Sequence, residues 1–567
     1  MKKKIVIASM GMCAFLATYA QQQDTTLVRT VVVENQYNPT VMDASKINVL
    51  PKVEEPTVPK AHIDYANSVR PVASWANQSM NPIVRDWTPD AAYRGYLRAG
   101  YGNNGNVDAR LGYLWDITKK DRLNVAASLD GWNGDLNGWN TSNEDWSGEK
   151  WTSRLYNTKL GVDFKHSFKK MDLSLGGNLH SRVFNYAYDE GRQHQTFASA
   201  YIGFASTDKD MPIQFEAQAG LRLYDEKYPK VDPYDELEKE TNIFITGNVW
   251  KSLSEGKNVG LGFNFDNYAH SPIWADDVMA IDFNPYYTIQ NDDWKVRLGA
   301  HLDWIGIDEA FSEDNDNQFY VSPDVNVEYI FLDSYVLYAK AGGGRSVSSF
   351  YDLMETVPYF KERKIKPTYM NLDAAVGLKA SPANGWWFHL AGGYQIRKND
   401  VCLYLYSMKY SDLYRGPQLM NYEGNTKVFY ATAELKHNYK DLWDFSLKGT
   451  YCHWNWEENL SDNSFADLAS SSEAIDALVL KPELEIIGEV GFKPVQGLRI
   501  NAGYEYVKRA EEIYDPISNL YVGADYALMK NLSIFAKANN LLNKEYVRAD
   551  AYPAQKLNFL AGLSLQF

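Results

Sequence analysis

Residues 554–567 read AQKLNFLAGLSLQF, and six apolar side chains among them recur at every second position. These are Leu557, Phe559, Ala561, Leu563, Leu565 and Phe567, whereas Asn558, Gly562, Ser564 and Gln566 lie between them. A repeat of two residues is that of a β-strand with one apolar and one polar face. The pattern predicts a membrane-spanning barrel strand whose lipid face includes Phe559, Leu563, Leu565 and Phe567.

The start of the chain has the features of an export signal. Three lysines at positions 2–4 precede an apolar stretch, and the small residues Thr18 and Ala20 precede Gln21. This order of basic, apolar and small residues is typical of a secretory signal peptide. We therefore expect residues 1–20 to be removed on export.

Composition narrows the class of protein. The 567 residues include 40 Tyr, 24 Phe, 16 Trp and 38 Gly, yet the mean hydropathy is -0.43. Beyond the signal, no stretch is apolar over the roughly 18 residues that a spanning helix needs. Many short strands with aromatic belts fit this composition. The net charge of -15 argues against a nucleic-acid partner.

Residues 21–90 differ from the rest of the chain because prolines punctuate them. These are Pro39, Pro51, Pro56, Pro59, Pro71 and Pro82. Prolines at this density do not suit central strands or helix interiors. We predict an extended periplasmic segment that becomes ordered only against the barrel or a partner.

From residue 91 to residue 567 the sequence alternates with period two in about 22 runs. Short polar turns and longer loops follow these runs in turn, which is the arrangement of periplasmic turns and outer loops in outer-membrane barrels. Among the longer loops we expect 132–148, 347–366, 399–423 and 458–475. The alternation also assigns faces, with Arg297, His301 and Asp303 inside one strand and Arg499 and Glu505 inside another. The predicted fold is all-β, a transmembrane antiparallel β-barrel with a polar interior.

Three motifs near the end of the chain carry a family resemblance. Residues 538–546 read ANNLLNKEY, Tyr552-Pro553 follows in a loop, and the last strand runs to Phe567. Together they resemble the end of TonB-dependent receptor barrels, in which an N-L-L-N-K-x-Y turn and a Y-P segment precede the final strand. The resemblance implies a 22-stranded barrel in the outer membrane of a Gram-negative bacterium, with a role in solute uptake or in binding a surface ligand.

The chain departs from this family before the barrel. Receptors of the family carry a plug domain of well over a hundred residues, and no plug motif is visible in residues 21–90. A barrel of 22 strands encloses a lumen that needs filling. Long outer loops, bulky inward side chains, the segment 21–90 or a separate protein could fill it. Residues Thr30, Val31, Val32, Val33 and Glu34 resemble a TonB box, or form a strand that pairs with a partner protein.

Other candidate sites are few. Trp132, Trp139 and Trp146 lie among Asn, Asp and Gly, a composition that suits either ligand contacts on an outer loop or an interfacial tryptophan belt. Cys402 and Cys452 remain after export, and a disulfide between them is left open. No motif for catalysis, metal or cofactor binding is present, so we expect a protein that is not an enzyme and has no cofactor.

Three functions remain open at this point. The first is a receptor-like barrel for solute uptake or surface-ligand binding. The second is a structural subunit that docks other envelope proteins through residues 21–90. The third is a passive diffusion pore. Outer-membrane lipid is a partner in all three, and a contact with TonB belongs to the first.

Overall fold

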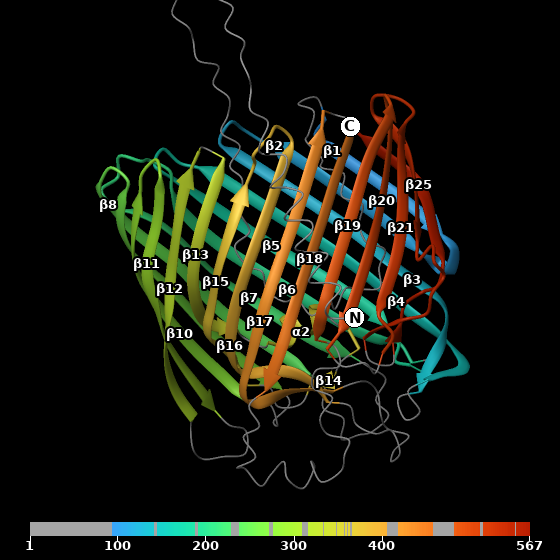
Figure 1. Ribbon diagram of the computed structural model, residues 1–567, viewed down its shortest axis with the longest axis horizontal. Helices are drawn as coiled ribbons and strands as arrows, with labels where there is room; N and C mark the ends of the chain where they lie inside the picture. The colour runs from blue at the N-terminus through green and yellow to red at the C-terminus, as the bar shows by residue number, and fades with distance from the viewer. Residues whose placement is uncertain are drawn as a thin grey trace, which may run out of the picture. The chain divides into compact units, whose positions relative to one another are not determined.

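The computed structural model describes residues 93–140, 145–187, 191–227, 238–271, 276–308, 316–332, 334–346, 349–356, 358–359, 361–362, 366–404, 418–440, 442–456, 481–510, 514–549 and 552–567. Within them, 22 antiparallel strands form a closed barrel, so the predicted fold class and strand number are confirmed (Figure 1). No helix among these residues has the length and hydropathy needed to cross a membrane.

The first half of the barrel consists of β1 (Gly95–Gly102), β2 (Val107–Asp116), β3 (Asp121–Asn140), β4 (Asp145–Ser167), β5 (Met171–Phe184), β6 (Gln193–Ser206), β7 (Gln214–Lys227), β8 (Lys239–Ser254), β9 (Lys257–Ser271), β10 (Asp277–Gln290) and β11 (Trp294–Asp308). The second half consists of β12 (Asp316–Phe331), β13 (Tyr335–Ser346), β15 (Thr368–Ala380), β16 (Trp386–Tyr404), β17 (Gln418–Tyr439), β18 (Trp443–Trp456), β19 (Pro482–Val495), β20 (Leu498–Arg509), β21 (Ile517–Ala527), β22 (Leu532–Asn539) and β25 (Asn558–Gln566).

Five short elements lie in the connections between barrel strands. They are the 3-10 turn η1 (Asn103–Gly105), helix α2 (Phe350–Thr356) and the short strands β14 (Lys361–Glu362), β23 (Val547–Ala549) and β24 (Tyr552–Pro553). β14 pairs in parallel with β17, and β23 pairs with β24 in a two-stranded sheet of its own. The sequence did not predict these elements, because runs this short carry no periodicity.

The last strand closes the barrel. β25 pairs with β22 on one side and with β1 on the other, where Leu97 lies opposite Leu565. The carbonyl of Phe567 accepts hydrogen bonds from the amides of Arg94 and Gly95 at 2.9 and 2.6 Å. Because each strand of the ring has two partners, the barrel has no unpaired edge.

Short turns gather at one end of the barrel and longer connections at the other (Figure 1). The turn between β8 and β9 is an example of a short one, and Gly256 within it has φ +70°. A Cβ added at Gly256 would lie 1.9 Å from the carbonyl oxygen of Gln290, so this turn requires glycine. Outer-membrane barrels carry their short turns on the periplasmic side, which makes the opposite end the outer mouth.

Side chains alternate between lipid and lumen. On β25, Phe559 and Leu563 are 56% and 52% exposed on the outer face, whereas Ser564 is buried and bonded to Ser533 at 2.6 Å. These exposures agree with the alternation of the last strand. The interior was predicted to be polar, and it is different near the outer mouth. There, large aromatic side chains face the lumen, and residues of the loops cover them.

A charge on the lipid face should destabilise the barrel far more than the same charge at an adjacent lumen position. Ile245 is exposed on the outer face of β8, and Thr246 beside it faces the lumen. We expect Ile245→Arg to lower the free energy of unfolding by about 2 to 4 kcal/mol, because arginine near the bilayer midplane loses its hydration. Thr246→Arg is the matched control, with a smaller loss. Urea titration of the refolded barrel in lipid vesicles measures both, and equal losses would contradict the face assignment.

Candidate functional site

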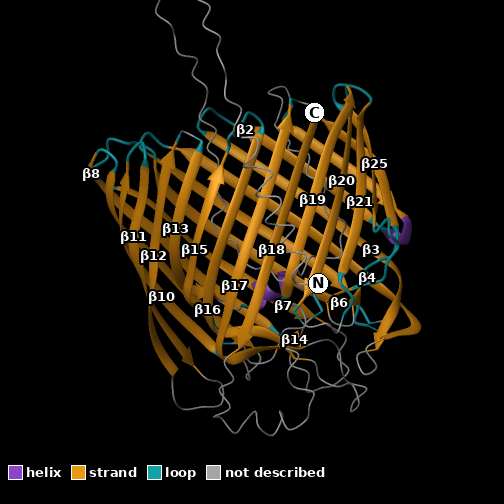
Figure 2. Cartoon of the chain, viewed as in Figure 1, coloured by secondary structure: helices purple, strands orange, loops and turns teal. Residues whose placement is uncertain are grey.

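The loop between β13 and β15 carries α2 into the lumen near the outer mouth (Figure 2). Ser349 starts the helix, because its hydroxyl accepts a hydrogen bond from the amide of Asp352 at 3.0 Å. Its carbonyl accepts another from the amide of Leu353 at 3.0 Å. A serine in this position supplies an acceptor that the first helical amides otherwise lack. The side chains of Phe350 and Met354, one helical turn apart, are buried.

Glu240 of β8 holds the start of α2. Its carboxylate accepts hydrogen bonds from the amide of Phe350 at 2.6 Å and from the amide of Tyr351 at 3.4 Å. The Nε2 atom of His270 lies 3.1 Å from the same carboxylate, and its Nδ1 atom lies 2.7 Å from the carbonyl oxygen of Asp276. The barrel wall thus supplies a negative charge where the helix presents free amides.

Arg182 of β5 holds the other end of α2. Its guanidinium donates hydrogen bonds to the carbonyl of Met354 and, at 2.8 Å, to the carbonyl of Glu355. It also donates to Asn157 at 2.8 Å and to Gln195 at 3.2 Å on the neighbouring strands. Arg182 is 0% exposed. The last carbonyls of a helix lack partners within the helix, so this arginine fixes α2 to the wall.

Replacing Arg182 should free the loop. Arg182→Met removes the donors to α2, and each hydrogen bond to a charged group contributes about 1.5 to 3 kcal/mol. We expect trypsin to cleave at the basic stretch 361–366 roughly tenfold faster or more, because cleavage follows local opening. Arg297→Met is the control, because Arg297 is a lumen arginine of β11 that is bonded to Asp324 and Asn284. Unchanged cleavage in Arg182→Met would show that α2 is held by other contacts.

Aromatic side chains from the wall and from three loops meet at the outer mouth. We name this set the outer-mouth cluster: Trp132, Leu136, Trp151, Leu155, Phe184, Tyr186, Phe197, Tyr224, Phe350, Met354, Tyr359, Tyr514, Val547 and Tyr552. The wall members lie on β3 to β7 or directly after β5, and the loop members come from the connections 346–368, 509–517 and 539–558. The last two connections start from β20 and β22, just across the barrel closure from β1, and the first starts from β13, so the cluster joins loops from separate parts of the ring to the wall of β3 to β7.

Ring stacking joins the loops within the cluster. The rings of Tyr359 and Tyr552 are stacked with centroids 3.7 Å apart, and Trp151 meets Tyr552 edge-on at 5.8 Å. The hydroxyl of Tyr552 accepts a hydrogen bond from the amide of Ala187 at 3.1 Å. Burial raises the pKa of the Tyr359 hydroxyl well above its usual range, so this loop residue packs in its neutral form.

Buried charges hold the 539–558 connection in place. Arg509 donates to the carbonyl of Val547 at 2.5 Å and to that of Arg548 at 3.2 Å. Arg548 in turn forms an ion pair with Glu505 of β20 at 2.8 Å. The lumen position predicted for Glu505 is therefore confirmed. Buried pairs of this kind fix geometry, since separating them leaves a charge without a partner.

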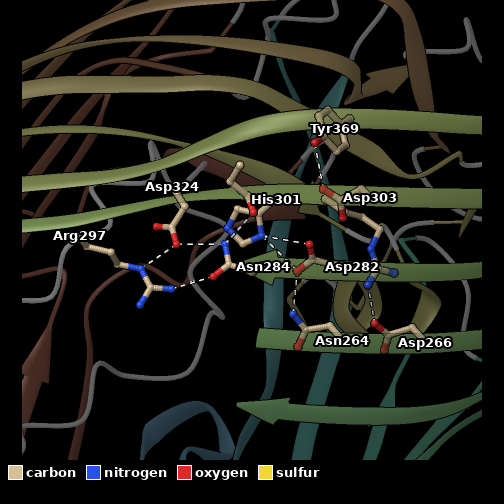
Figure 3. A network of polar contacts seen from close by, with 11 residues as sticks. Asn264, Asp266, Asp282, Asn284, Arg297, His301, Asp303, Asp324 and Tyr369 are labelled. Carbon is tan, nitrogen blue, oxygen red and sulfur yellow. Dashed lines mark hydrogen bonds and ion pairs between the residues drawn. The ribbon is translucent and has the colours of Figure 1, made fainter. Parts of the chain in front are cut away.

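The wall from β9 to β15 carries a network of polar contacts (Figure 3). The carboxylate of Asp282 accepts a hydrogen bond from the side-chain amide of Asn264 at 2.9 Å, and it lies 3.1 Å from Nδ1 of His301. The guanidinium of Arg297 donates to Asp324 at 2.7 Å and to Asn284 at 2.7 Å. Further pairs complete the network, Tyr369 with Asp303 at 2.9 Å and Arg345 with Asp266 at 2.6 Å. The predicted lumen face of β11 is confirmed.

The predicted tryptophans lie on a hairpin and not on a loop. Most of residues 132–148 extends β3 and β4, so the expected outer loop is wrong over that stretch. Trp132 is 0% exposed inside the outer-mouth cluster, which excludes a place in the lipid belt. Trp139 lies opposite Trp146 in the hairpin register. Their role as ligand contacts stays a prediction.

Three further predictions have different outcomes. The segment Thr30 to Glu34 lies outside the described residues. Cys452 is a buried free thiol, so the structure gives no support to a disulfide with Cys402. In the described ranges, no three His, Cys, Asp or Glu side chains are grouped so that they could hold a metal ion. Arg182 and Glu240, which position α2, had no motif that could have identified them.

Solved structures that resemble this one include transporters and receptors. The FrpB iron transporter from Neisseria meningitidis matches with a TM-score of 0.66 and 10% identity, over 84% of this chain and 82% of that one. The copper transporter OprC matches at 0.61 and 13%, over 84% and 80%. The ferric-catecholate import receptor Fiu from E. coli K12 matches at 0.60 and 11%, over 84% and 82%. No protein-family model matches the sequence, and no curated protein sequence resembles it significantly.

The chain therefore has the barrel fold of TonB-dependent receptors of the Gram-negative outer membrane. The resemblance inferred from its C-terminal motifs is confirmed at the level of fold. At identities of 9 to 13% the likeness concerns architecture; function has to be argued from the site.

Proposed function

We propose that this chain is a receptor-type barrel that binds a solute from outside the cell and admits it to the lumen, without a plug of its own. The observation that carries the proposal is the outer-mouth cluster, in which residues of three loops pack against the inner wall of β3 to β7, and this packing would close the lumen. A barrel of this size needs a filler, and the cluster supplies one from the barrel's own chain. The same closure disfavours a permanently open diffusion pore.

The polar network on the wall from β9 to β15 supports a path for a polar solute. Its carboxylates, arginines and amides face the lumen and are bonded to one another. Such side chains can exchange their present hydrogen bonds for hydrogen bonds to the polar groups of a solute. The structural neighbours are described as iron, copper and ferric-catecholate transporters or receptors. By analogy, a metal ion or its chelate is the solute class to test first. Residues Thr30 to Glu34 would then contact TonB.

A second function is favoured by the way the closure is held. Arg182 and Arg548 fix the loops through buried hydrogen bonds and an ion pair, which suits a barrel that stays shut. In this alternative the chain is a structural subunit of an envelope complex. Residues 21–90 would dock its partners, with Thr30 to Glu34 adding a strand to a partner sheet.

The two proposals differ in metal uptake and in association. We would compare the iron and copper content of metal-limited cells that carry the wild-type gene, no gene, or a variant lacking residues 24–85. A receptor predicts lower content without the gene and with the variant. If all three strains contain equal metal and the barrel purifies in mild detergent with a stoichiometric envelope protein, the structural-subunit function stands and the receptor function falls.

A further inference from the structure

The strands that close the barrel carry a charged cluster on their lumen face. β1 lies between β2 and β25, and β22 follows β25. Leu97 and Tyr101 of β1 are exposed on the lipid side. Arg98, at the opposite parity, therefore faces the lumen. Asp108 of β2 and Lys537 of β22 are buried near it and bonded to each other.

Two glycines shape this part of the wall. Gly100 lies opposite Gly562 in the register, and a Cβ added at either would lie 2.7 Å from the ring of Phe535. The ring therefore lies over both glycines. The guanidinium of Arg98 stacks on this ring, 3.5 Å from its centroid. Stacking holds the guanidinium plane in one orientation and leaves its nitrogen edge free for partners in that plane.

Positive charge exceeds negative charge in this cluster. The carboxylate of Asp108 accepts a hydrogen bond from Lys537 at 3.0 Å and one from Nε of Arg110 at 2.9 Å, while Nε of Arg98 lies 3.5 Å away. Three cations thus face one carboxylate.

The nitrogen edge of Arg98 makes an ion pair with Asp108 at 3.5 Å but lacks a hydrogen-bond acceptor among the described residues. Its Nε and Nη2 atoms have no hydrogen-bond acceptor among the described residues, although Arg98 is only 5% exposed. These two N–H groups point the same way and match two oxygens of a carboxylate or phosphate. Burying such donors without an acceptor costs free energy. Both oxygens of Asp108 already accept from Lys537 and Arg110.

We propose that Arg98, Lys537 and Arg110 form an oxyanion site on the lumen wall at the barrel closure. The occupant is a phosphate or carboxylate group, bound through the paired donors of Arg98 and through the excess positive charge. The site is independent of transport, because it requires only that the barrel be folded.

Calorimetry on the purified full chain in detergent tests the site, with inorganic phosphate, acetate and neutral glycerol as probes at constant ionic strength. We expect wild-type protein to bind phosphate or acetate but not glycerol. Arg98→Gln should weaken anion binding about tenfold or more, the effect of losing a charged hydrogen bond. Arg98→Lys keeps the charge and loses the paired donors, so it should also bind more weakly. It serves in place of Arg98→Gln if that variant does not fold.

Arg499→Gln is the matched control. Arg499 is a lumen arginine of β20 whose guanidinium is already bonded to Asp444 at 3.1 Å and to Asn501 at 3.0 Å. This variant should bind the anions as the wild type does. Absence of anion binding by wild-type protein would overturn the proposal, as would equal binding by the wild type and the Arg98 variants.

Discussion

Replacing residues 347–367 by a two-residue Asn-Gly turn is expected to open the barrel. Ser346 lies opposite Thr368 in the β13–β15 register, so a hairpin turn can join the two strands without disturbing the wall. The replacement removes α2 and Tyr359 from the outer-mouth cluster. We expect a large ohmic conductance in planar bilayers, whereas the wild-type barrel should conduct little. Sensitivity of the cells to bulky antibiotics should rise in parallel.

The matched control shortens a different outer loop. Residues 309–315 connect β11 to β12, and Ile307 lies opposite Asp316 at their ends. Replacing 309–315 by the same Asn-Gly turn removes no member of the outer-mouth cluster, and the conductance should stay low. If both replacements behave alike, or if removal of 347–367 leaves the conductance unchanged, the loops do not close the lumen.

Deleting residues 558–567 should abolish assembly of the barrel. This deletion removes β25, which supplies the partner of both β22 and β1. Two strands would then present unpaired backbone groups within the bilayer, where each costs several kcal/mol. We expect no folded form in outer membranes, as judged by the heat-dependent mobility of folded barrels in SDS gels. A persistent folded form would contradict closure through β25.

The barrel itself was predictable from the sequence because alternation is a local signal. A run such as 277–290 shows its own apolar and polar faces, and β10 has those bounds. The lumen positions of Arg297, His301 and Glu505 followed from the same parity. These residues could be assigned to a face without knowing which distant residues they contact.

The outer-mouth cluster was not predictable in this way. Its loop members lie in segments without periodicity, and their burial depends on strands far away in the sequence. Trp132 shows the difficulty, because the Asn, Asp and Gly residues around it suggested either a ligand-binding loop or a belt at the lipid interface. Its parity with the inward residues Ser128 and Asp130 places it in the lumen. Only the contacts of three loops explain why an aromatic ring is buried there.

Hydrogen–deuterium exchange over residues 349–354 tests the closed outer mouth most directly. The amides of Phe350, Asp352 and Leu353 donate to Glu240 and Ser349 within the lumen. They should therefore exchange slowly, at rates close to those of the neighbouring strands β7 and β8. Exchange as fast as that of an unstructured peptide, in the folded full-length barrel, would show that α2 does not occupy the lumen and would contradict the account.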